Sequence, residues 1–390
     1  MAGTTVFVTG AGGFVGSRLA HRLALGEEMD VRALVHNISG ANSMRLGRLP
    51  IEIEEGSVLD RERVADLVSD CDAVVHCAHG DAETTIDGTR TVLEAAEQAG
   101  VESFVHVSSA AVHGHEVDGE VVESSPLDPD TDYARRKARA EKVVQRADER
   151  MALSPTVFRP MIVYGPHSRW VTTPVEQLRQ GTVLADGGVG ALNQIHVDNL
   201  VDAVVLALND PAADGEVFLA VDDDTVTWNQ YYAALGEVLG EHPPVKSLSW
   251  REIRLKEKTW YLRDSVVPPA RLFAYLFTST DLRERAFSEI KETPWAKAIY
   301  RSLPERLQDA AVDLVSPDGG GGSLPASGSN GDSATDPNYE MPTRNVLRMQ
   351  SATGTLSNEK LKETLGWEPR VSFPEAMDLL AEWMEYEELV

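Results

Sequence analysis

The chain has 390 residues, enough for a large core and for two domains, and 42% of them are hydrophobic, an ordinary share for a soluble globular protein. Its formal net charge of −26 argues against nucleic acid as a partner. There is no apolar run long enough to span a bilayer and no basic-then-apolar leader, so we expect a cytoplasmic location. Two cysteines, Cys71 and Cys77, make neither a disulfide framework nor a metal cluster, and no metal is expected.

The acidic excess has two explanations. One is solubility alone. The other is a high-salt cytoplasm, in which dense carboxylates keep the surface hydrated; the run Asp222–Asp224 and the small number of lysines fit it. The second explanation predicts a stability that rises steadily up to molar KCl, and a flat response in a denaturation series would contradict it.

The first twenty residues predict a strand, a glycine turn and a helix. The apolar run from Val6 to Val8 is typical of a buried parallel strand, and a helical apolar pattern begins at Val15. Glycines at 10, 13 and 16 separate the two. Glycine takes backbone angles closed to other residues and lets the main chain approach a pyrophosphate, while the helix N-terminus offers N–H groups. This stretch therefore predicts a dinucleotide-binding turn.

Strands and helices alternate over the first half of the chain. Apolar runs predict strands at 31–35, 51–53, 72–78, 104–107 and 156–158. Helical patterns lie between them at 64–68, 85–99 and 133–148. Such alternation predicts a doubly wound parallel sheet covered on both faces, with ligands beyond the carboxyl ends of the strands.

A second chemical cluster combines Ser109 with Tyr133 and Lys137. Ser109 ends a predicted buried strand, and Tyr133 and Lys137 lie four residues apart on one face of a predicted helix. A free tyrosine has a pKa near 10. We expect the Lys137 ammonium to lower the pKa of Tyr133, so that Tyr133 exchanges a proton with a substrate oxygen that Ser109 hydrogen-bonds.

With these motifs the chain resembles the extended short-chain dehydrogenase/reductase family, which includes nucleotide-sugar epimerases and dehydratases. The resemblance covers about 1–245 and 351–385. The segments that carry it are 9–16, 72–78, 88–89, 108–114, 133–137, 158–166, 195–203 and 361–370.

The resemblance implies a Rossmann-type fold, a bound NAD or NADP and a homodimer. It makes Ser109, Tyr133 and Lys137 the catalytic triad, with Tyr133 as acid/base and Lys137 also holding the nicotinamide ribose. The residues that would cradle the pyrophosphate are Gly10, Gly13, Phe14, Val15 and Gly16. Those expected by the adenine and along the middle of the cofactor are Ser57, Val58, Cys77, Ala78 and His79.

Four positions depart from the family pattern. Members that prefer NAD carry an acid where this chain has Val35, and His36, Arg45 or Arg48 could meet a 2′-phosphate, which favours NADP. The family often has an asparagine three residues before Gly88. This chain has Thr85 there, so we expect one of the groups that support the site to be weaker. The asparagine of many nucleotide-sugar enzymes is Ile162, which weakens a nucleotide-sugar assignment. Where the family frequently has a tyrosine, this chain has His113, which we interpret as a loop histidine.

The second half is divided as follows. Residues 1–180 are predicted to form the NAD(P)-binding domain, 181–245 and 341–390 a smaller substrate lobe, 246–315 a helical insertion rich in aromatic and basic residues, and 316–340 a flexible linker. The insertion has three interpretations: a lid over the substrate, an oligomer contact, or a peripheral membrane contact through 250–310. His196 and Asp198 are expected to pack and cap a helix rather than to catalyse.

Three functions remain open at this point. The leading one is an NAD(P)-dependent oxidoreductase of the epimerase/dehydratase type that acts on a nucleotide sugar. The alternative is an NADP-dependent reductase or dehydrogenase of an apolar ketone, steroid-like or isoprenoid substrate. The third is a non-catalytic dinucleotide-binding regulator, which the intact Ser109, Tyr133 and Lys137 disfavour.

Overall fold

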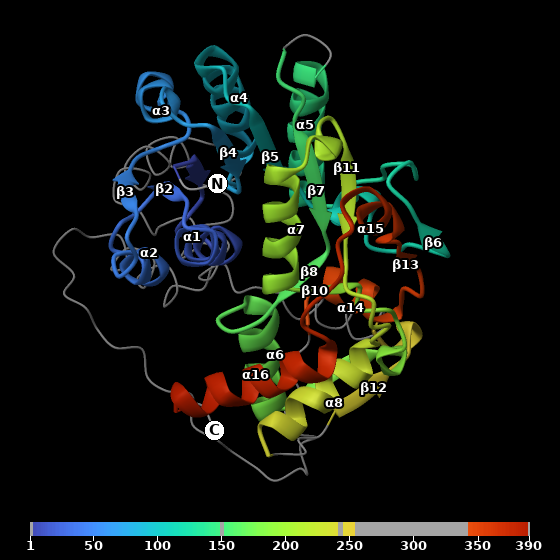
Figure 1. Cartoon of the computed structure of the whole chain (residues 1–390). Helices are drawn as coiled ribbons and strands as arrows, with labels where there is room; N and C mark the ends of the chain where they lie inside the picture. The colour runs from blue at the N-terminus through green and yellow to red at the C-terminus, as the bar shows by residue number, and fades with distance from the viewer. Residues whose placement is uncertain (1–2, 149–151, 241–244, 254–341, 389–390) are drawn as a thin grey trace, which may run out of the picture. The chain divides into compact units, whose positions relative to one another are not determined.

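The computed structural model describes residues 3–148, 152–240, 245–253 and 342–388. Its centre is a seven-stranded sheet in the order β11-β7-β5-β4-β1-β2-β3, in which every neighbouring pair is parallel (Figure 1). These strands are β1 (Thr5–Thr9), β2 (Asp30–Val35), β3 (Glu52–Glu55), β4 (Ala73–His76), β5 (Ser103–Val107), β7 (Thr156–Pro160) and β11 (Val217–Ala220). The predicted doubly wound Rossmann-type sheet is confirmed.

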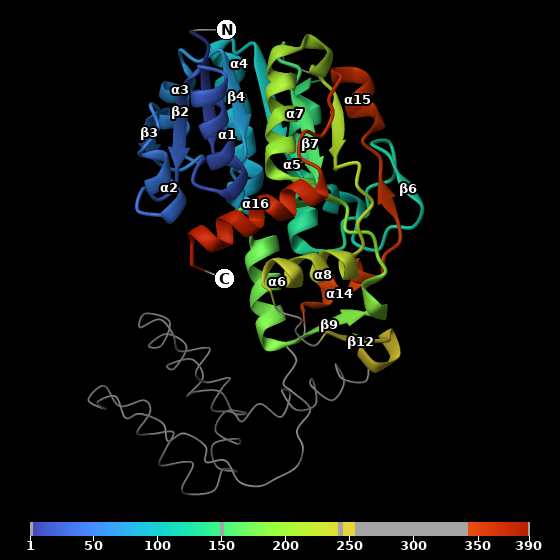
Figure 2. The ribbon, with the colours of Figure 1, turned by 60° about the horizontal axis from the view of Figure 1, so that its bottom comes forward.

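A smaller lobe lies beyond the carboxyl end of β7 (Figure 2). Its strands form parallel pairs: β8 (Ile162–Tyr164) with β10 (Gln194–His196), and β9 (Thr182–Ala185) with β12 (Val245–Leu248). Its helices are α6 (Arg169–Gln180), α8 (Trp228–Val238), α14 (Arg344–Ser351) and α16 (Phe373–Tyr386). They enclose a core in which Trp228, Tyr164, Tyr231 and Tyr232 are almost fully buried. A further pair joins β6 (Glu120–Val121) and β13 (Thr355–Leu356).

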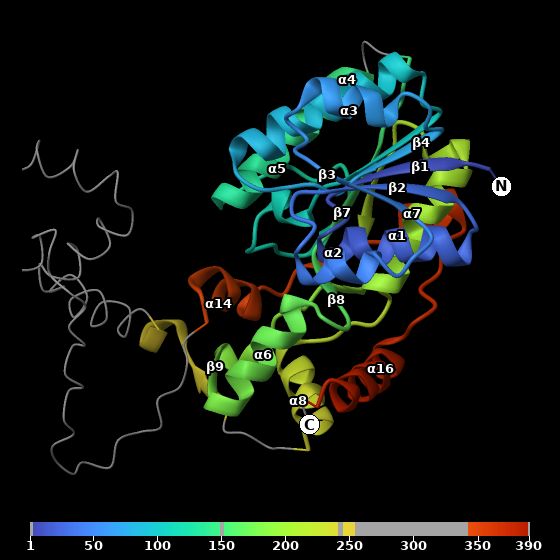
Figure 3. The ribbon, with the colours of Figure 1, turned by 90° about the vertical axis from the view of Figure 1, so that its left-hand side faces the viewer.

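Helices cover both faces of the large sheet (Figure 3). On one face lie α1 (Phe14–Gly26), α2 (Ala41–Leu46) and α7 (Val197–Asn209), with α15 (Glu359–Leu365) beside α7. On the other lie α3 (Arg61–Val68), α4 (Gly88–Ala99) and α5 (Asp132–Asp148). Short turns of helix occur at Glu83–Asp87, Ala110–His113, Asp186–Gly188 and Pro211–Ala213.

Local sequence explains where several helices begin and end. The carboxylate of Asp60 accepts a hydrogen bond from the N–H of Arg63 and caps α3, and Ser168 caps α6 in the same way. Gly100 ends α4 with φ +71, a conformation that glycine adopts without strain. The helix predicted at 85–99 starts with a π-helical turn at Glu83–Asp87 before α4.

The structure corrects the predicted domain boundaries. The strand β11 lies within 181–245 but pairs with β7 in the large sheet, where Phe218 packs on Phe158 with ring centroids 5.5 Å apart. Leu361 and Trp367, from the segment assigned to the lobe, pack in the core under α1 and α7. These pairings join residues distant in sequence, so periodicity alone could not assign them.

The insertion predicted to start at 246 also begins differently, because Lys246–Leu248 belong to β12 in the lobe. The rest of the insertion from 254, the linker at 316–340 and nearly all of the membrane contact proposed for 250–310 lie outside the described residues. Within the described part, every helix is too short or too polar to cross a bilayer.

Candidate active site

The turn between β1 and α1 depends on its glycines. Gly10 has φ +66, and a Cβ there would lie 2.7 Å from the backbone nitrogen of Ala78, so both conformation and space require glycine. A Cβ on Gly16 would collide with the carbonyl oxygen of Gly10. Gly13 precedes the first turn of α1, and its N–H donates to Gly10 O at 2.9 Å. This cradle and the unpaired N–H groups of a helix N-terminus fit a dinucleotide pyrophosphate.

Replacing Gly10 with alanine is expected to abolish dinucleotide binding and to destabilise the fold. A left-handed conformation at a non-glycine residue costs about 1–3 kcal/mol, before the collision with Ala78 is counted. Gly47→Ala is the matched control, because a Cβ there would meet Met44 O at an ordinary 3.4 Å. Calorimetric titration with NAD and NADP, together with thermal unfolding, measures both effects. Wild-type affinity in Gly10→Ala would contradict this role for the turn.

The other predicted cofactor residues lie along the same edge of the sheet. The turn contacts both neighbouring strands: Ala11 N–H donates to Leu34 O at 3.3 Å, and Cys77 N–H donates to Thr9 O at 3.2 Å. After β4, Cys77 is buried, Ala78 half-buried and His79 exposed. After β2 and β3 come His36, which is exposed, Ser57, which is half-buried, and Val58, which is buried. Contact of these residues with a cofactor stays a prediction.

Thr85 gives the loop after β4 the support that we expected to be weakened. Its buried hydroxyl accepts a hydrogen bond from Gly80 N–H at 3.0 Å and donates to Gly80 O at 3.2 Å. A single threonine thus satisfies both backbone groups of Gly80. The expectation of weaker support at this position was wrong.

A chain of buried hydrogen bonds behind the turn was not predicted. His76 Nδ1 lies 2.7 Å from Thr9 Oγ1, and His76 Nε2 lies 3.0 Å from Thr89 Oγ1. Because Thr89 donates its own proton to Thr85 O at 2.6 Å, it accepts from His76 Nε2–H, and Nδ1 accepts from Thr9. Burial lowers the pKa of His76 to about 3 and keeps it neutral. These hydrogen bonds connect β1, β4 and α4. The sequence feature that could have indicated them is the presence of polar residues inside otherwise apolar elements.

The three predicted catalytic residues meet at the carboxyl end of β5. Ser109 is buried, and its Oγ accepts from Ala111 N–H at 3.3 Å. Tyr133 lies in the first turn of α5, is 37% exposed, and meets the His79 ring edge-on with centroids 6.1 Å apart. Lys137 is buried one turn later, and its Nζ donates to Val107 O at 2.8 Å. This places a phenol, an aliphatic hydroxyl and a cation beside the glycine turn, and their catalytic roles stay a prediction.

The electrostatics of Tyr133 differ from the expectation. Burial raises the pKa of Tyr133, and the hydroxyl of Ser109 and the charges of Arg169 and Arg136 oppose that rise. These two arginines, rather than Lys137, are the cations that lower the Tyr133 pKa. The Lys137 ammonium turns toward the carbonyl of Val107, and burial lowers the pKa of Lys137 itself to about 8. Helix spacing placed Tyr133 and Lys137 on one face but could not show where the lysine side chain points.

Replacing Lys137 with methionine is expected to stabilise the cofactor-free protein at neutral pH while weakening cofactor binding. Folding lowers the pKa of this lysine from 10.5 to about 8, so between these values the folded state binds fewer protons than the unfolded state. The free energy of unfolding of the wild type therefore rises with pH across that window, and the advantage of the variant shrinks. Urea unfolding at several pH values measures this, with Lys142→Met, an exposed lysine on α5, as control. An advantage that does not change with pH would contradict the assignment.

The model of the NAD dependent epimerase/dehydratase family matches residues 6–220. The chain belongs to this family. It is therefore an enzyme with NAD-dependent oxidoreductase chemistry, and the family identified from the motifs is confirmed.

Similar proteins of this epimerase/dehydratase family include enzymes with different substrates. An N-acetyl-alpha-D-glucosaminyl-diphospho-ditrans,octacis-undecaprenol 4-epimerase of Escherichia coli O157:H7 is 28% identical over 63% of this chain and 75% of its own. A 4-hydroxy-2-methyl-3-oxo-4-farnesyl-3,4-dihydroquinoline-1-oxide ketoreductase of Stigmatella aurantiaca is 30% identical over 69% and 85%. The UDP-glucose 4-epimerase of Thermotoga maritima, solved with UDP-glucose, superposes with a TM-score of 0.65 and 21% identity, covering 99% of this chain and 100% of its own. Its identity is too low to carry more than the fold.

Two further positions of this family member have structural explanations. Ile162 is buried in β8 within the lobe core. His113 is not the loop residue that we favoured: it is buried in a short helical turn, with Nε2 3.2 Å from Arg159 Nη1 and Nδ1 3.1 Å from Pro126 O. A polar network holds it, which a single sequence does not reveal.

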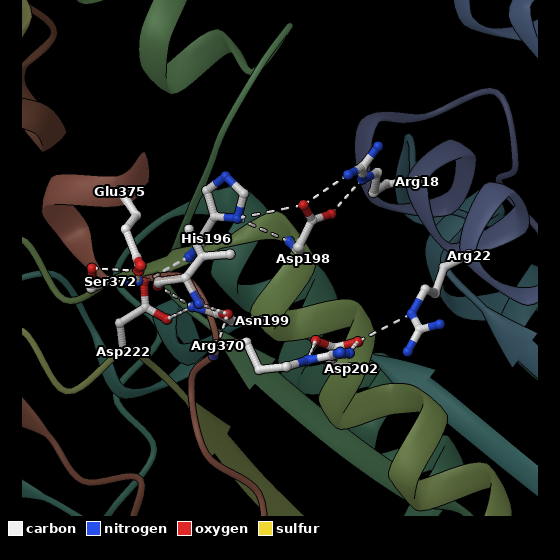
Figure 4. A network of polar contacts seen from close by, with 11 residues as sticks. Arg18, Arg22, His196, Asp198, Asn199, Asp202, Asp222, Arg370, Ser372 and Glu375 are labelled. Atoms are coloured by element: carbon white, nitrogen blue, oxygen red, sulfur yellow. Dashed lines mark hydrogen bonds and ion pairs between the residues drawn. The ribbon is translucent and has the colours of Figure 1, made fainter. Parts of the chain in front are cut away.

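His196 and Asp198 have the structural role that we predicted (Figure 4). The ring of His196 accepts from Asp198 N–H and caps α7, and the Asp198 carboxylate binds Arg18 of α1. The neighbouring Asn199 joins the lobe to α7, because its Oδ1 accepts from the N–H of Arg370 and its Nδ2 donates to Asp222. These contacts hold the two parts of the enzyme together.

Proposed function

We propose that this enzyme oxidises and reduces a carbon of a nucleotide sugar, with Tyr133 exchanging the proton of the substrate oxygen. The observation that carries the proposal is the convergence of Ser109, Tyr133 and Lys137 at the carboxyl end of β5, beside the glycine turn. A hydroxyl pair in this position can bind one substrate oxygen from two directions. The Escherichia coli O157:H7 relative, a 4-epimerase of a sugar carried on a diphosphate, supports a diphosphate-linked sugar as the substrate class.

The chain supplies the proton chemistry. When bound, the nicotinamide cofactor accepts or returns a hydride at the substrate carbon. Tyr133 takes the hydroxyl proton during oxidation and gives it back during reduction, while Ser109 orients the oxygen. The Lys137 ammonium, which donates to Val107 O, is positioned to hold the cofactor ribose. The cradle at Gly10 and Gly16 excludes side chains from the space that the pyrophosphate requires.

We infer NADP as the preferred cofactor from the end of β2. Val35 is buried there, no carboxylate stands at 35–37, and His36 is exposed. The fold brings one carboxylate to this loop: Glu55, whose Oε1 accepts from Ile38 N–H at 3.2 Å. Its negative charge would repel a 2′-phosphate. Titration with both dinucleotides tests the inference, and Glu55→Gln should raise the affinity for NADP relative to NAD. Tighter binding of NAD would refute the preference.

A reductase of an apolar ketone is the second candidate. Ile162 stands where an asparagine serves many nucleotide-sugar enzymes, and a ketoreductase is among the 30% identical relatives. One experiment separates the two: release and identify any dinucleotide that copurifies, then measure turnover of UDP-sugars and of apolar ketones. Tightly retained NAD with UDP-sugar turnover supports the epimerase/dehydratase activity. Exchangeable NADP with ketone turnover supports the reductase. A protein that binds dinucleotide but turns over neither class would favour the regulator.

Assembly and location are further proposals. The homodimer comes from family resemblance, and light scattering after gel filtration tests it. The cytoplasmic location comes from composition, and fractionation of the producing cells tests it.

A further inference from the structure

Two arginines beside Tyr133 form no ion pair with any residue that the structure describes. Arg136 lies three residues after Tyr133 on α5, a spacing that puts neighbouring side chains on one helix face. Its Nε is buried without a hydrogen-bond partner. Other arginines behave differently: Arg135 binds Asp132 at 2.6 Å, and Arg159 binds Glu141 at 2.6 Å. A buried charged donor without a partner destabilises the folded state, so Arg136 is available to a partner that the described part of the chain does not supply.

Arg169 approaches from the smaller lobe. It is the first residue of α6, and its guanidinium lies over the ring of Trp170 at 5.4 Å from the centroid. Stacking on an aromatic ring fixes the plane of a guanidinium and leaves its N–H edge available. In the part of the chain that the structure describes, no carboxylate oxygen lies within ion-pair distance of Arg136 or Arg169.

The charges of both arginines converge on the reaction centre. Each lowers the pKa of Tyr133, and each adds to the lowering of the His79 pKa that burial and Lys137 mainly cause; the His79 ring meets Tyr133 edge-on. The nearby carboxylates of Asp81 and Asp132 bind other groups, Thr84 N–H at 2.8 Å and Arg135 at 2.6 Å. In a chain with a net charge of −26, two cations that no described carboxylate pairs with form a local positive site at Tyr133.

We propose that Arg136 and Arg169 together bind an anionic group of the substrate next to Tyr133. The group is a carboxylate or a phosphate, because these oxyanions match the planar donors of a guanidinium. This inference rests on the proposed function and narrows it: an apolar ketone would leave both cations desolvated and unpaired, whereas a diphosphate or a sugar carboxylate would satisfy them. Arg136 and Arg169 are thus specificity-determining residues contributed by the two lobes.

The test uses the full chain loaded with cofactor and two probes, UDP-glucose and UDP-glucuronic acid, with inorganic diphosphate and free glucuronate as fragments. We expect Arg136→Met and Arg169→Gln each to weaken binding about 10- to 100-fold by calorimetry, as the loss of a charge-assisted hydrogen bond predicts. Equal losses for both nucleotides and for diphosphate identify the phosphates as the bound group. Losses restricted to UDP-glucuronic acid and glucuronate identify the sugar carboxylate.

The matched control is Arg139→Gln, which removes the same charge from an exposed position on the same helix. If all variants bind the probes as Arg139→Gln does, or if the wild type binds none of the four anions, the proposal is wrong. Arg136→Lys keeps the positive charge but lacks the planar guanidinium donors, so it should recover part of the affinity. This variant keeps the test informative if Arg136→Met fails to fold. Failure of the proposed function looks different: anion binding would persist and depend on both arginines while no substrate is turned over.

Discussion

Replacing Tyr133 with phenylalanine should lower kcat by about 10²–10⁴-fold and leave dinucleotide affinity nearly unchanged. The substitution removes the hydroxyl that exchanges the proton and keeps the ring, whose edge contact with His79 lies at 6.1 Å between centroids. The Oγ of Ser109 retains its hydrogen bond from Ala111 N–H. The site therefore stays assembled without its acid/base.

The measurement is steady-state turnover of whichever UDP-sugar or ketone the wild type converts, with calorimetric titration of the dinucleotide in parallel. Tyr386→Phe provides the control, because that side chain is 84% exposed and far along the chain from the catalytic segments. Activity of Tyr133→Phe within a few fold of the wild type would remove Tyr133 from the mechanism.

The pKa of Tyr133 also determines how the rates of oxidation and reduction change with pH. Because burial raises the pKa of Tyr133, its neutral phenol predominates at neutral pH. Oxidation, which needs the phenolate, should become faster as pH rises, and reduction, which needs the phenol, should become slower. Loss of Arg136 or Arg169 should move both profiles to higher pH, since their charges lower the Tyr133 pKa.

The fold could be predicted because its signals are local. Apolar runs such as Val6–Val8, the glycines of the first turn and the helix ending at Gly100 each depend on neighbouring residues. The parallel pairing of the strands follows from their alternation with helices, since parallel strands need crossovers. The assignment of β11 failed because its partner β7 lies far away in sequence.

The site could be predicted only in part. Spacing placed Tyr133 and Lys137 on one face of a helix, and the structure brings Ser109 near enough to Tyr133 to lower the pKa of that phenol. The direction of Lys137 depends on packing under α5, and the approach of Arg169 depends on how the lobe folds back, so neither follows from spacing. Arg136 stood within the predicted motif but received no role, because its unpartnered Nε is visible only in three dimensions.

The buried ion pair between Arg159 and Glu141 should make a large contribution to the free energy of unfolding. Arg159 of β7 and Glu141 of α5 are 3% and 1% exposed at their side chains, and Arg159 Nη2 lies 2.6 Å from Glu141 Oε2. Arg159 also donates to Glu123 O at 3.1 Å, and the hydroxyl of Ser108, next to Ser109, donates to Glu141. The pair therefore joins α5, which carries Tyr133, to the sheet that carries Ser109.

Arg159→Met is expected to lower the free energy of unfolding by about 3–5 kcal/mol, because it leaves the Glu141 carboxylate buried without its cation. The double variant Glu141→Gln/Arg159→Met should recover much of the loss, because the amide oxygen of glutamine still accepts from Ser108 and no buried charge remains.

Urea unfolding of the single and double variants measures these differences, with Arg90→Met as control. Arg90 pairs with Asp87 at the surface, where the two side chains are 41% and 51% exposed, so its loss should stay below about 1 kcal/mol. A single variant as stable as this control would show that the buried pair contributes little. If the double variant is no more stable than Arg159→Met, the loss comes from packing of the arginine side chain and not from the unpaired charge of Glu141. The kcat of the double variant would then show whether the attachment of α5 to the sheet is needed for Tyr133 to reach its substrate.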